Sequence, residues 1–491
     1  MFWSAWILVG WVALLRWAAP LTAPDSRSER WAVLTDGVAM VASGVGFFVA
    51  TTLYFPKYYL LNTSLVASDF AQYCESVGAA QSGVLALVHP QRSMYESLLP
   101  GLFARGYGIM GGFVLSAALS QIVTGAAIYV WARTIGGRVA GFSAVLLCST
   151  MLPVALLGRT MTFYPQTVAV MVVAAATAAL AATRRTAASM VLAGIGAGLA
   201  LLWDVRGLYW AVAVIAAAAV AGIVGPPSEP IPVNRRVARG VARLVLLAAP
   251  IGMSWWIGHN YTPVNAQGLT VQTINFLRDA PGAASGAWPR PQFDFVWGRT
   301  SLFDIVPALR EIAGLNQTVG VGVSAHGLGL ATVGPWCAPV GICALAMVWG
   351  LRRNLWAIFG FCGPVVPFAA SLWSALFVNG HPRYLGVGMP CLAVCAGVGL
   401  AMMLRGEGGR VPPRWRGLLA VGVLGLLVSG VLPGWLSPVA PWRSKFAGEQ
   451  YPGVMLTNPP STLAADARCV ALLAEDRAHQ RQWPLYDAAG R

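Results

Sequence analysis

Long uninterrupted apolar runs constrain this chain more than any other feature. The 491-residue sequence contains about twelve of them, and roughly 18 residues are enough for a helix to cross a hydrocarbon core about 30 Å thick. Backbone polar groups in lipid must be satisfied internally, so each run predicts a helix. The runs lie near 2–20, 32–55, 107–131, 139–158, 166–182, 187–203, 207–224, 244–258, 328–351, 355–378, 384–404 and 417–436. The predicted fold is therefore an all-α polytopic membrane protein.

The composition agrees with this class. Hydrophobic residues make up 57% of the chain and charged residues 10%, against roughly 25% charged residues in soluble domains. The net charge of +15 could indicate nucleic-acid binding, but the basic residues are dispersed among loops rather than gathered on one soluble domain. We interpret the positive charge as a determinant of membrane topology.

Arginine placement predicts which loops are cytoplasmic, because short cytoplasmic loops retain positive charge. Alternate short loops carry the arginines Arg16, Arg27 and Arg30; Arg133 and Arg138; Arg184 and Arg185; Arg235, Arg236, Arg239 and Arg243; Arg352 and Arg353; and Arg405, Arg410, Arg414 and Arg416. The intervening segments are then extracytoplasmic, including long ones at 56–106, 259–327 and 437–491, and both termini lie outside. The chain divides into a membrane domain, 1–436, and a short extracytoplasmic tail, 437–491.

Lysine is nearly absent, since Lys57 and Lys445 are the only two. With abundant alanine and glycine, this indicates a bacterial protein, and hence a bacterial inner membrane protein whose outer segments face the periplasm or exterior. The run at 2–20 has small residues at Ala18 and Ala23, as a signal peptide would. It lacks a positive n-region, and its removal would invert every later helix, so we interpret it as a membrane helix.

The outer segment 56–106 contains the main candidate acid, Asp69. Apolar residues from 65 to 87 are interspersed with polar ones as in a helix lying along the membrane surface. Four polar residues recur at helical spacing and can share one face: Asp69, Gln72, Tyr73 and Ser76. Such a face could present a carboxylate to a substrate whose lipid tail stays in the bilayer.

Two other residues of this segment are weaker candidates. Glu75 lies six residues after Asp69, near the opposite face of the predicted helix, and is better explained as a solvated loop acid. His89 precedes Pro90 and could either contact a phosphate or cap a turn.

Charge within the predicted spans is almost absent, whereas proton- or ion-driven transporters usually place acids or histidines there. Asp36 is near one helix end, and Asp204 and Arg206 lie at another. The polar residues are concentrated in the outer loops, which favours surface chemistry. A transporter or lipid flippase remains the alternative, but we find no internal repeat of the kind such proteins carry. A third hypothesis, a non-catalytic assembly protein, explains the outer loops alone.

Several motifs resemble those of the GT-C membrane glycosyltransferases, in particular the protein-mannosyl and aminoarabinosyl transferase group. Asp69, Tyr73, His89-Pro90 and Leu99-Pro100 are similar to the first outer loop of that family. The segment from Gly380 to Leu385, including Arg383 and Tyr384, is similar to its late Arg-Tyr-Leu segment, and Gly136 to Gly141 is similar to its fourth-helix region.

The chain departs from the family pattern in three ways. Asp69 is followed by Phe70 rather than by a glutamate, one more helix precedes the loop at 56–106, and no large soluble domain follows the last span. These departures leave the subfamily open.

The resemblance implies a polyprenyl-phosphate sugar donor and inversion at the anomeric carbon, with an unidentified lipid, glycan or protein acceptor. A carboxylate that takes the acceptor's proton and a positive charge on the leaving phosphate both help such a reaction. We assign Asp69 as general base and Arg383, with Tyr384 beside it, as phosphate ligand, since guanidinium binds phosphate oxygens in pairs. Arg206 is a second phosphate candidate, or an ion-pair partner of Asp204.

The sequence does not demand a cofactor or metal, because the outer loops contain no Asp-x-Asp pair. A divalent cation shared between Asp69 and the donor phosphate is an open alternative.

Overall fold

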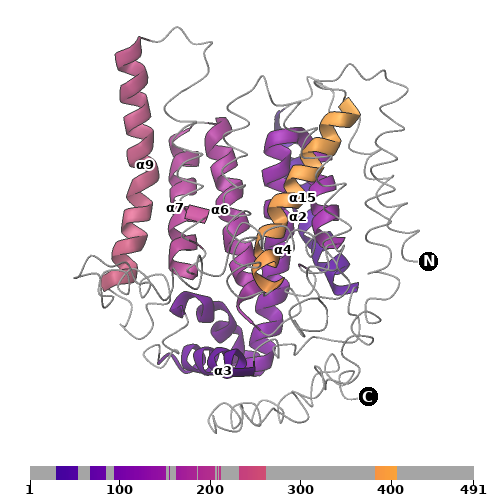
Figure 1. Cartoon of the computed structure of the whole chain (residues 1–491), viewed down its shortest axis with the longest axis vertical. Helices are drawn as coiled ribbons and strands as arrows, with labels where there is room; N and C mark the ends of the chain where they lie inside the picture. The colour runs from indigo at the N-terminus through magenta and orange to yellow at the C-terminus, as the bar shows by residue number, and fades with distance from the viewer. Residues whose placement is uncertain are drawn as a thin grey trace, which may run out of the picture.

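The computed structural model describes residues 29–53, 67–84, 93–150, 154, 162–184, 186–204, 207, 210–211, 232–260 and 382–405. Most of these residues lie in helices, in chain order α2 (Glu29–Leu53), α3 (Ala67–Ser82), α4 (Met94–Thr150), α6 (Tyr164–Arg184), α7 (Ala187–Trp203), α9 (Val233–Asn260) and α15 (Pro382–Arg405). In Figure 1 the long helices stand side by side as a bundle, and α3 lies across one end of it.

The described part confirms the all-helical class. Three of its helical stretches are long and apolar enough to cross a membrane, Gly111–Ser149, Tyr164–Arg184 and Val237–Gly258. Shorter apolar helices cover Thr35–Thr51, Ala187–Trp203 and Gly388–Met402. The spans predicted at 2–20, 328–351, 355–378 and 417–436, and nearly all of 207–224, lie outside the described residues. The prediction of about twelve spans is therefore not tested.

The stretch Gly111–Ser149 is two passes rather than one. A continuous helix of its 39 residues would be about 58 Å long, nearly twice the hydrocarbon thickness. Gly137 interrupts it with φ 77° and ψ −175°, a backbone conformation that is essentially restricted to glycine.

The chain reverses at Gly137. A Cβ placed on Gly141 would lie 3.0 Å from the carbonyl oxygen of Tyr129, although residues twelve apart in one helix are separated by about 18 Å. The Tyr129 and Phe142 rings are also 5.0 Å apart. This helical hairpin matches the two runs predicted at 107–131 and 139–158.

One end of the bundle collects most of the described basic residues. Arg133 and Arg138 flank the hairpin turn, and both bind Asp36 of α2. Arg184 ends α6, whose first turn lies at the opposite end beside α3, since Phe163 contacts Tyr73 at a ring distance of 4.8 Å. We call the two ends the basic end and the α3 end.

Helix directions agree with the predicted alternation of loops. A Cβ on Gly194 would meet Leu247, and one on Gly258 would meet Leu202, so α7 and α9 run in the same direction. The arginine-rich start of α9 therefore lies at the basic end with Arg184. The segregation of arginines to one end is what the topology predicted; which side of a membrane that end faces remains a prediction.

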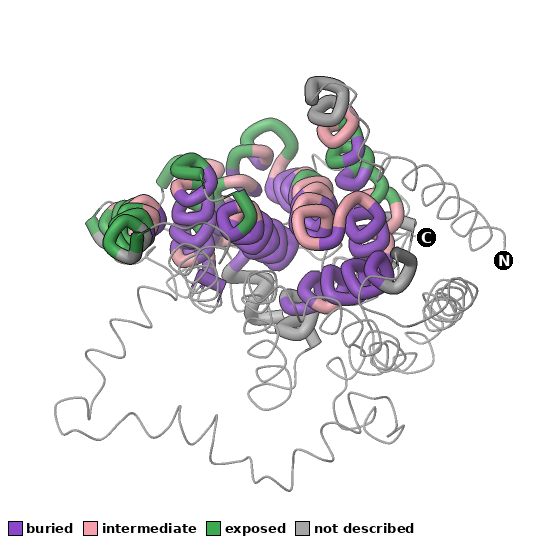
Figure 2. The backbone as a smooth tube through the Cα atoms, turned by 90° about the horizontal axis from the view of Figure 1, so that it is seen from above, coloured by how far each residue is buried: buried purple, intermediate pink, exposed green. Residues whose placement is uncertain are grey.

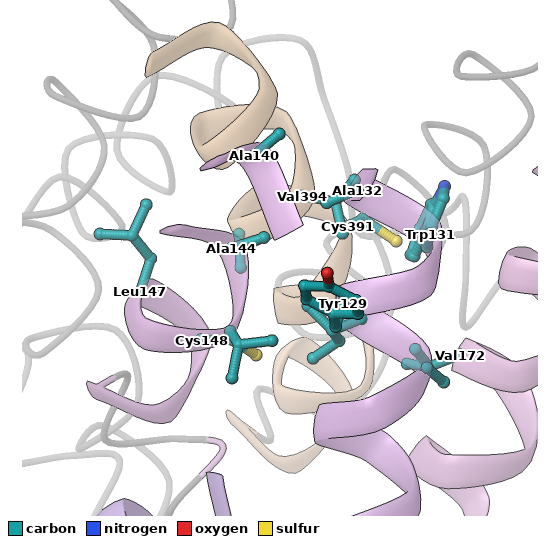
Figure 3. Packing of buried hydrophobic residues seen from close by; sticks show 14 of the residues in the cluster. Tyr129, Trp131, Ala132, Ala140, Ala144, Leu147, Cys148, Val172, Cys391 and Val394 are labelled. Carbon is teal, nitrogen blue, oxygen red and sulfur yellow. The ribbon is translucent and has the colours of Figure 1, made fainter. Parts of the chain in front are cut away.

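Small residues allow the helices to approach closely, as in other membrane bundles. A Cβ on Gly397 of α15 would lie 2.6 Å from the backbone nitrogen of Ala144. Figure 3 shows the core that results, in which side chains from α4, α6 and α15 pack together, including Tyr129, Cys148, Val172, Cys391 and Val394. Buried residues occupy the middle of the bundle in Figure 2, and α9 lies at its edge with exposed valines.

Candidate functional site

The α3 end of the bundle carries two short helices. The first is α3, which matches the surface helix predicted between 65 and 87. It ends at Gly83, whose φ of 76° permits a glycine cap: Gly83 N donates to Ala80 O, and Val84 N donates to Ala79 O at 3.0 Å. The second is the first segment of α4, residues 94–107, which ends where Gly108 adopts φ 75°.

These two short helices are fastened to each other. The Gln81 side-chain amide donates to the Ala104 carbonyl at 2.9 Å, and Arg105 Nε donates to the Gln81 carbonyl at 3.2 Å. α3 thus forms a pair with the start of α4 rather than lying alone on the membrane surface.

Asp69 is the third residue of α3, within its first turn. A carboxylate there is favoured by the partial positive charge of the helix N-terminus. Its side chain, like that of Gln72, lies outside the described residues.

Tyr73 and Ser76, predicted to share the Asp69 face, are both buried against the bundle, with 2% and 0% exposure. The Tyr73 ring meets Phe163 edge-to-face, and Phe163 in turn stacks on Phe113 at 5.9 Å. This aromatic group attaches α3 to α4 and α6 at the α3 end of the bundle. Glu75, between them in sequence, is half-buried.

A buried carboxylate that sequence reasoning missed lies next to this aromatic group. Glu96, in the first turn of α4, is 5% exposed. Thr167 of α6 donates its hydroxyl to Glu96 Oε1 at 3.4 Å and to the Phe163 carbonyl at 3.0 Å. The preceding residue of α6, Gln166, and the Ser116 hydroxyl form a buried hydrogen bond of 2.7 Å.

A sequence signal for Glu96 was present. Ser93-Met94-Tyr95-Glu96 has the Ser-x-x-Glu spacing of a helix start, and the Ser93 hydroxyl accepts from Tyr95 N at 3.2 Å. The same hydroxyl donates to the Leu202 carbonyl of α7 at 2.7 Å. The start of α4 is therefore anchored to α7 through Ser93 and to α6 through Glu96.

Arg383 and Tyr384 are the second and third residues of α15. The later part of α15 lies at the basic end, since a Cβ on Gly136 would meet Val398 there. Pro382, about 24 Å earlier along the helix, is thus directed toward the α3 end. The structure brings the first turns of α3 and α15 to the same end; their predicted site side chains lie outside the described residues, as do His89 and Arg206.

A second buried acid, Asp204, caps the C-terminal end of α7 and is 6% exposed. Gly207 N donates to its carbonyl at 2.8 Å. Among the described residues, no group of three or more His, Cys, Asp or Glu side chains is arranged to hold a metal ion.

Comparisons with known proteins gave no matching family model and no matching curated protein. Among solved structures, the chain is similar to the apo oligosaccharyltransferase of Archaeoglobus fulgidus, with TM-score 0.46, 12% identity, and coverage of 88% of this chain and 60% of that one. It is also similar to that enzyme in complex with an inhibitory peptide and a dolichol-phosphate, with TM-score 0.45, 13% identity and coverage of 87% and 59%.

A third similar structure is ArnT from Cupriavidus metallidurans bound to undecaprenyl phosphate, with TM-score 0.40, 16% identity, and coverage of 94% of this chain and 76% of that one. Of the oligosaccharyltransferase described above, the chain spans about 60% of the length. Both enzymes belong to the GT-C superfamily that the sequence motifs resemble. Because all these TM-scores are below 0.5, we base the function on this chain's own residues.

Proposed function

We propose that this chain is an integral membrane glycosyltransferase that moves a sugar from a polyprenyl-phosphate donor to an acceptor at the α3 end of the bundle. One observation carries the proposal. The surface helix with Asp69 in its first turn lies across the end of the bundle toward which the start of α15, with Arg383, is directed. An acid and a guanidinium at one end of an apolar helix bundle suit a donor whose phosphate sits at the membrane surface and whose tail stays in the bilayer.

The reaction is a single displacement with inversion. The acceptor hydroxyl or amine attacks the anomeric carbon, the bond to the phosphate oxygen breaks, and the phosphate leaves with the electron pair. Asp69 takes the acceptor's proton on the attacking side, and Arg383 and Tyr384 hold the leaving phosphate on the other. A base and a phosphate ligand on two separate helices can flank the anomeric carbon, as inversion requires.

Glu96 acts in this proposal as a positioning residue. Glu96 lies on the first segment of α4 and joins it to Thr167 of α6. The same segment of α4 is hydrogen-bonded to α3 through Gln81 and Arg105. A fixed α3 keeps the Asp69 backbone in one place relative to the bundle, which matters because small misplacements of a catalytic group cost large factors in rate.

The outer location follows from the arginines. By the positive-inside tendency the basic end faces the cytoplasm, and the α3 end then faces the periplasm or exterior of a bacterial inner membrane. His89 and Arg206 are further contacts for the donor, and the acceptor is a lipid, a glycan or a protein.

The proposal is tested by sugar transfer from a labelled polyprenyl-phosphate donor in membranes holding equal amounts of each variant. Asp69→Asn keeps the side-chain size but cannot accept the proton, so transfer should fall by roughly 10²–10⁴-fold, the range for lost acid–base assistance. Glu75→Gln, the same change six residues later on α3, should stay within a few-fold of wild type. Near-normal transfer by Asp69→Asn would exclude it as the base.

A further inference from the structure

The C-terminal end of α7 is a closely packed support at the α3 end of the bundle. Its cap, Asp204, has φ −149° and ψ 153° and donates its backbone N–H to the Ala200 carbonyl. Gly207 then lies back against α7: its N–H donates to the Asp204 carbonyl at 2.8 Å, and a Cβ on it would overlap the Ala200 carbonyl oxygen. Only glycine allows so close an approach of two backbone segments.

One carbonyl of this helix end is satisfied from outside α7. The last four carbonyls of an α-helix have no partner within the helix, and that of Leu202 is one of them. The Ser93 hydroxyl donates to it at 2.7 Å across 109 residues of sequence, and Ser93 is 4% exposed. The same hydroxyl accepts from Tyr95 N at 3.2 Å at the start of α4. One buried hydroxyl therefore satisfies the ends of two helices.

This bond joins two elements that pack little against each other. Among the described elements, α4 packs mainly against α15, α2, α6 and α3, and only slightly against α7. The first segment of α4, residues 94–107, follows directly after Ser93 and is hydrogen-bonded to α3 through Gln81 and Arg105. Asp69 is in the first turn of α3. A chain of hydrogen bonds therefore runs from the end of α7 to the helix of the proposed base.

We propose that Ser93 is a positioning residue for the general base. Its bond to Leu202 fixes the first segment of α4 on α7, and thereby fixes α3 and the Asp69 backbone. This role rests on the proposed function, in which Asp69 takes the acceptor's proton. Glu96 holds the same segment on α6, so bonds to two different helices set its position. A base displaced by about 1 Å can slow a reaction by up to roughly 10²-fold.

The test is labelled-sugar transfer by membranes holding equal amounts of full-length variants. In Ser93→Ala, turnover should fall by roughly tenfold while the donor KM stays within about twofold, because the base moves and the donor contacts stay. Ser93→Thr keeps a hydroxyl and should recover most of the turnover. The matched control is Ser97→Ala, since the Ser97 hydroxyl donates to the Met94 carbonyl of its own helix at 2.8 Å; its loss should be less than about twofold. Equal losses in the two alanine variants would overturn the role of Ser93.

A double variant separates positioning of the base from a general loss of folded protein. In an Asp69→Asn background no carboxylate remains to be misplaced, so adding Ser93→Ala should slow the residual transfer by less than about twofold. A merely structural role would multiply the two separate losses, and that result would overturn the proposal.

The same assay distinguishes failure of this role from failure of the proposed function. Near-normal transfer by Asp69→Asn alone would refute the base, and the role of Ser93 with it. Lost transfer by Asp69→Asn combined with unchanged transfer by Ser93→Ala would refute the role of Ser93 alone.

A physical measurement of the same link needs no substrate. Spin labels attached through Ser82→Cys at the end of α3 and Leu199→Cys on α7 occupy exposed positions and report the distance between these helices. Adding Ser93→Ala should broaden the distance distribution, whereas adding Ser97→Ala should leave it unchanged. A distribution in Ser93→Ala as narrow as that of the parent chain would overturn the link between α7 and α3.

Discussion

At the residue scale, Glu96 and Arg383 illustrate two ways in which an ionisable side chain can contribute to the proposed sugar transfer. Glu96 is buried and hydrogen-bonded by Thr167, so its removal takes away a contact between the start of α4 and α6, and the loss of one such hydrogen bond costs about 0.5–1.5 kcal/mol. Arg383 stands in the first turn of α15, where a change should affect a ligand more than the packing of the core.

We expect Glu96→Ala to lower both thermal stability and sugar transfer, because the first segment of α4 loses its contact with α6. Glu96→Gln keeps the volume and an oxygen that accepts from Thr167, so stability should fall by no more than about 1 kcal/mol and transfer should be largely kept. Thermal unfolding in detergent and the transfer assay check this pair. Full stability combined with lost transfer in Glu96→Gln would mean that the carboxylate charge takes part in the chemistry itself.

Arg383→Ala should weaken donor use far more than folding, because a methyl group cannot replace a phosphate contact. Arg383→Lys should recover only part of it, since an ammonium group lacks the planar pair of donors. The measurements are the KM for the polyprenyl-phosphate sugar, turnover, and the unfolding temperature. If both variants keep wild-type donor KM and turnover, Arg383 is a headgroup anchor rather than a donor ligand.

At the element scale, the α4 hairpin decides how many times this part of the chain crosses the bundle. Its turn depends on Gly137, because φ 77° with ψ −175° is a conformation that a side chain strongly disfavours. This hairpin turn also brings Arg133 and Arg138 to the Asp36 carboxylate. The backbone conformation at Gly137 therefore affects the ion cluster that joins the α4 hairpin to α2.

Gly137→Ala should destabilise the protein by about 1–3 kcal/mol through backbone strain. Gly46→Ala is the matched control, because Gly46 is inside α2 and a Cβ there would meet nothing within 4 Å. That change should be neutral or stabilising by up to about 1 kcal/mol, since alanine favours helix. The yield of monodisperse protein and its unfolding temperature distinguish the two; equal behaviour would contradict the hairpin.

At the scale of the whole molecule, most described arginines lie at one end, and the short helices lie at the other, where Figure 1 shows α3. Ser82 and Ala187 are exposed positions on the α3 end and the basic end respectively. They provide a direct measure of which end faces the cytoplasm.

A cysteine at Ser82 should be labelled by a membrane-impermeant maleimide added to intact cells, and a cysteine at Ala187 only after the membrane is opened. Labelling is measured as the increase over the wild-type chain. The described native cysteines at 74, 148, 391 and 395 are buried, so they should contribute little to the background. The reverse pattern would invert the topology and move the proposed site to the cytoplasmic face.

The sequence alone determined the helical class, the positions of the described apolar helices, the helix with Asp69, and the gathering of most described arginines at one end. Length, hydropathy and charge of each segment are local properties, and they suffice for these features. Only the tertiary structure decided that Glu96 meets Thr167 across 71 residues and that Asp36 joins Arg133 across 97. Such pairs depend on which helices pack together and at what rotation, and a buried polar contact forms only where packing excludes water from both partners.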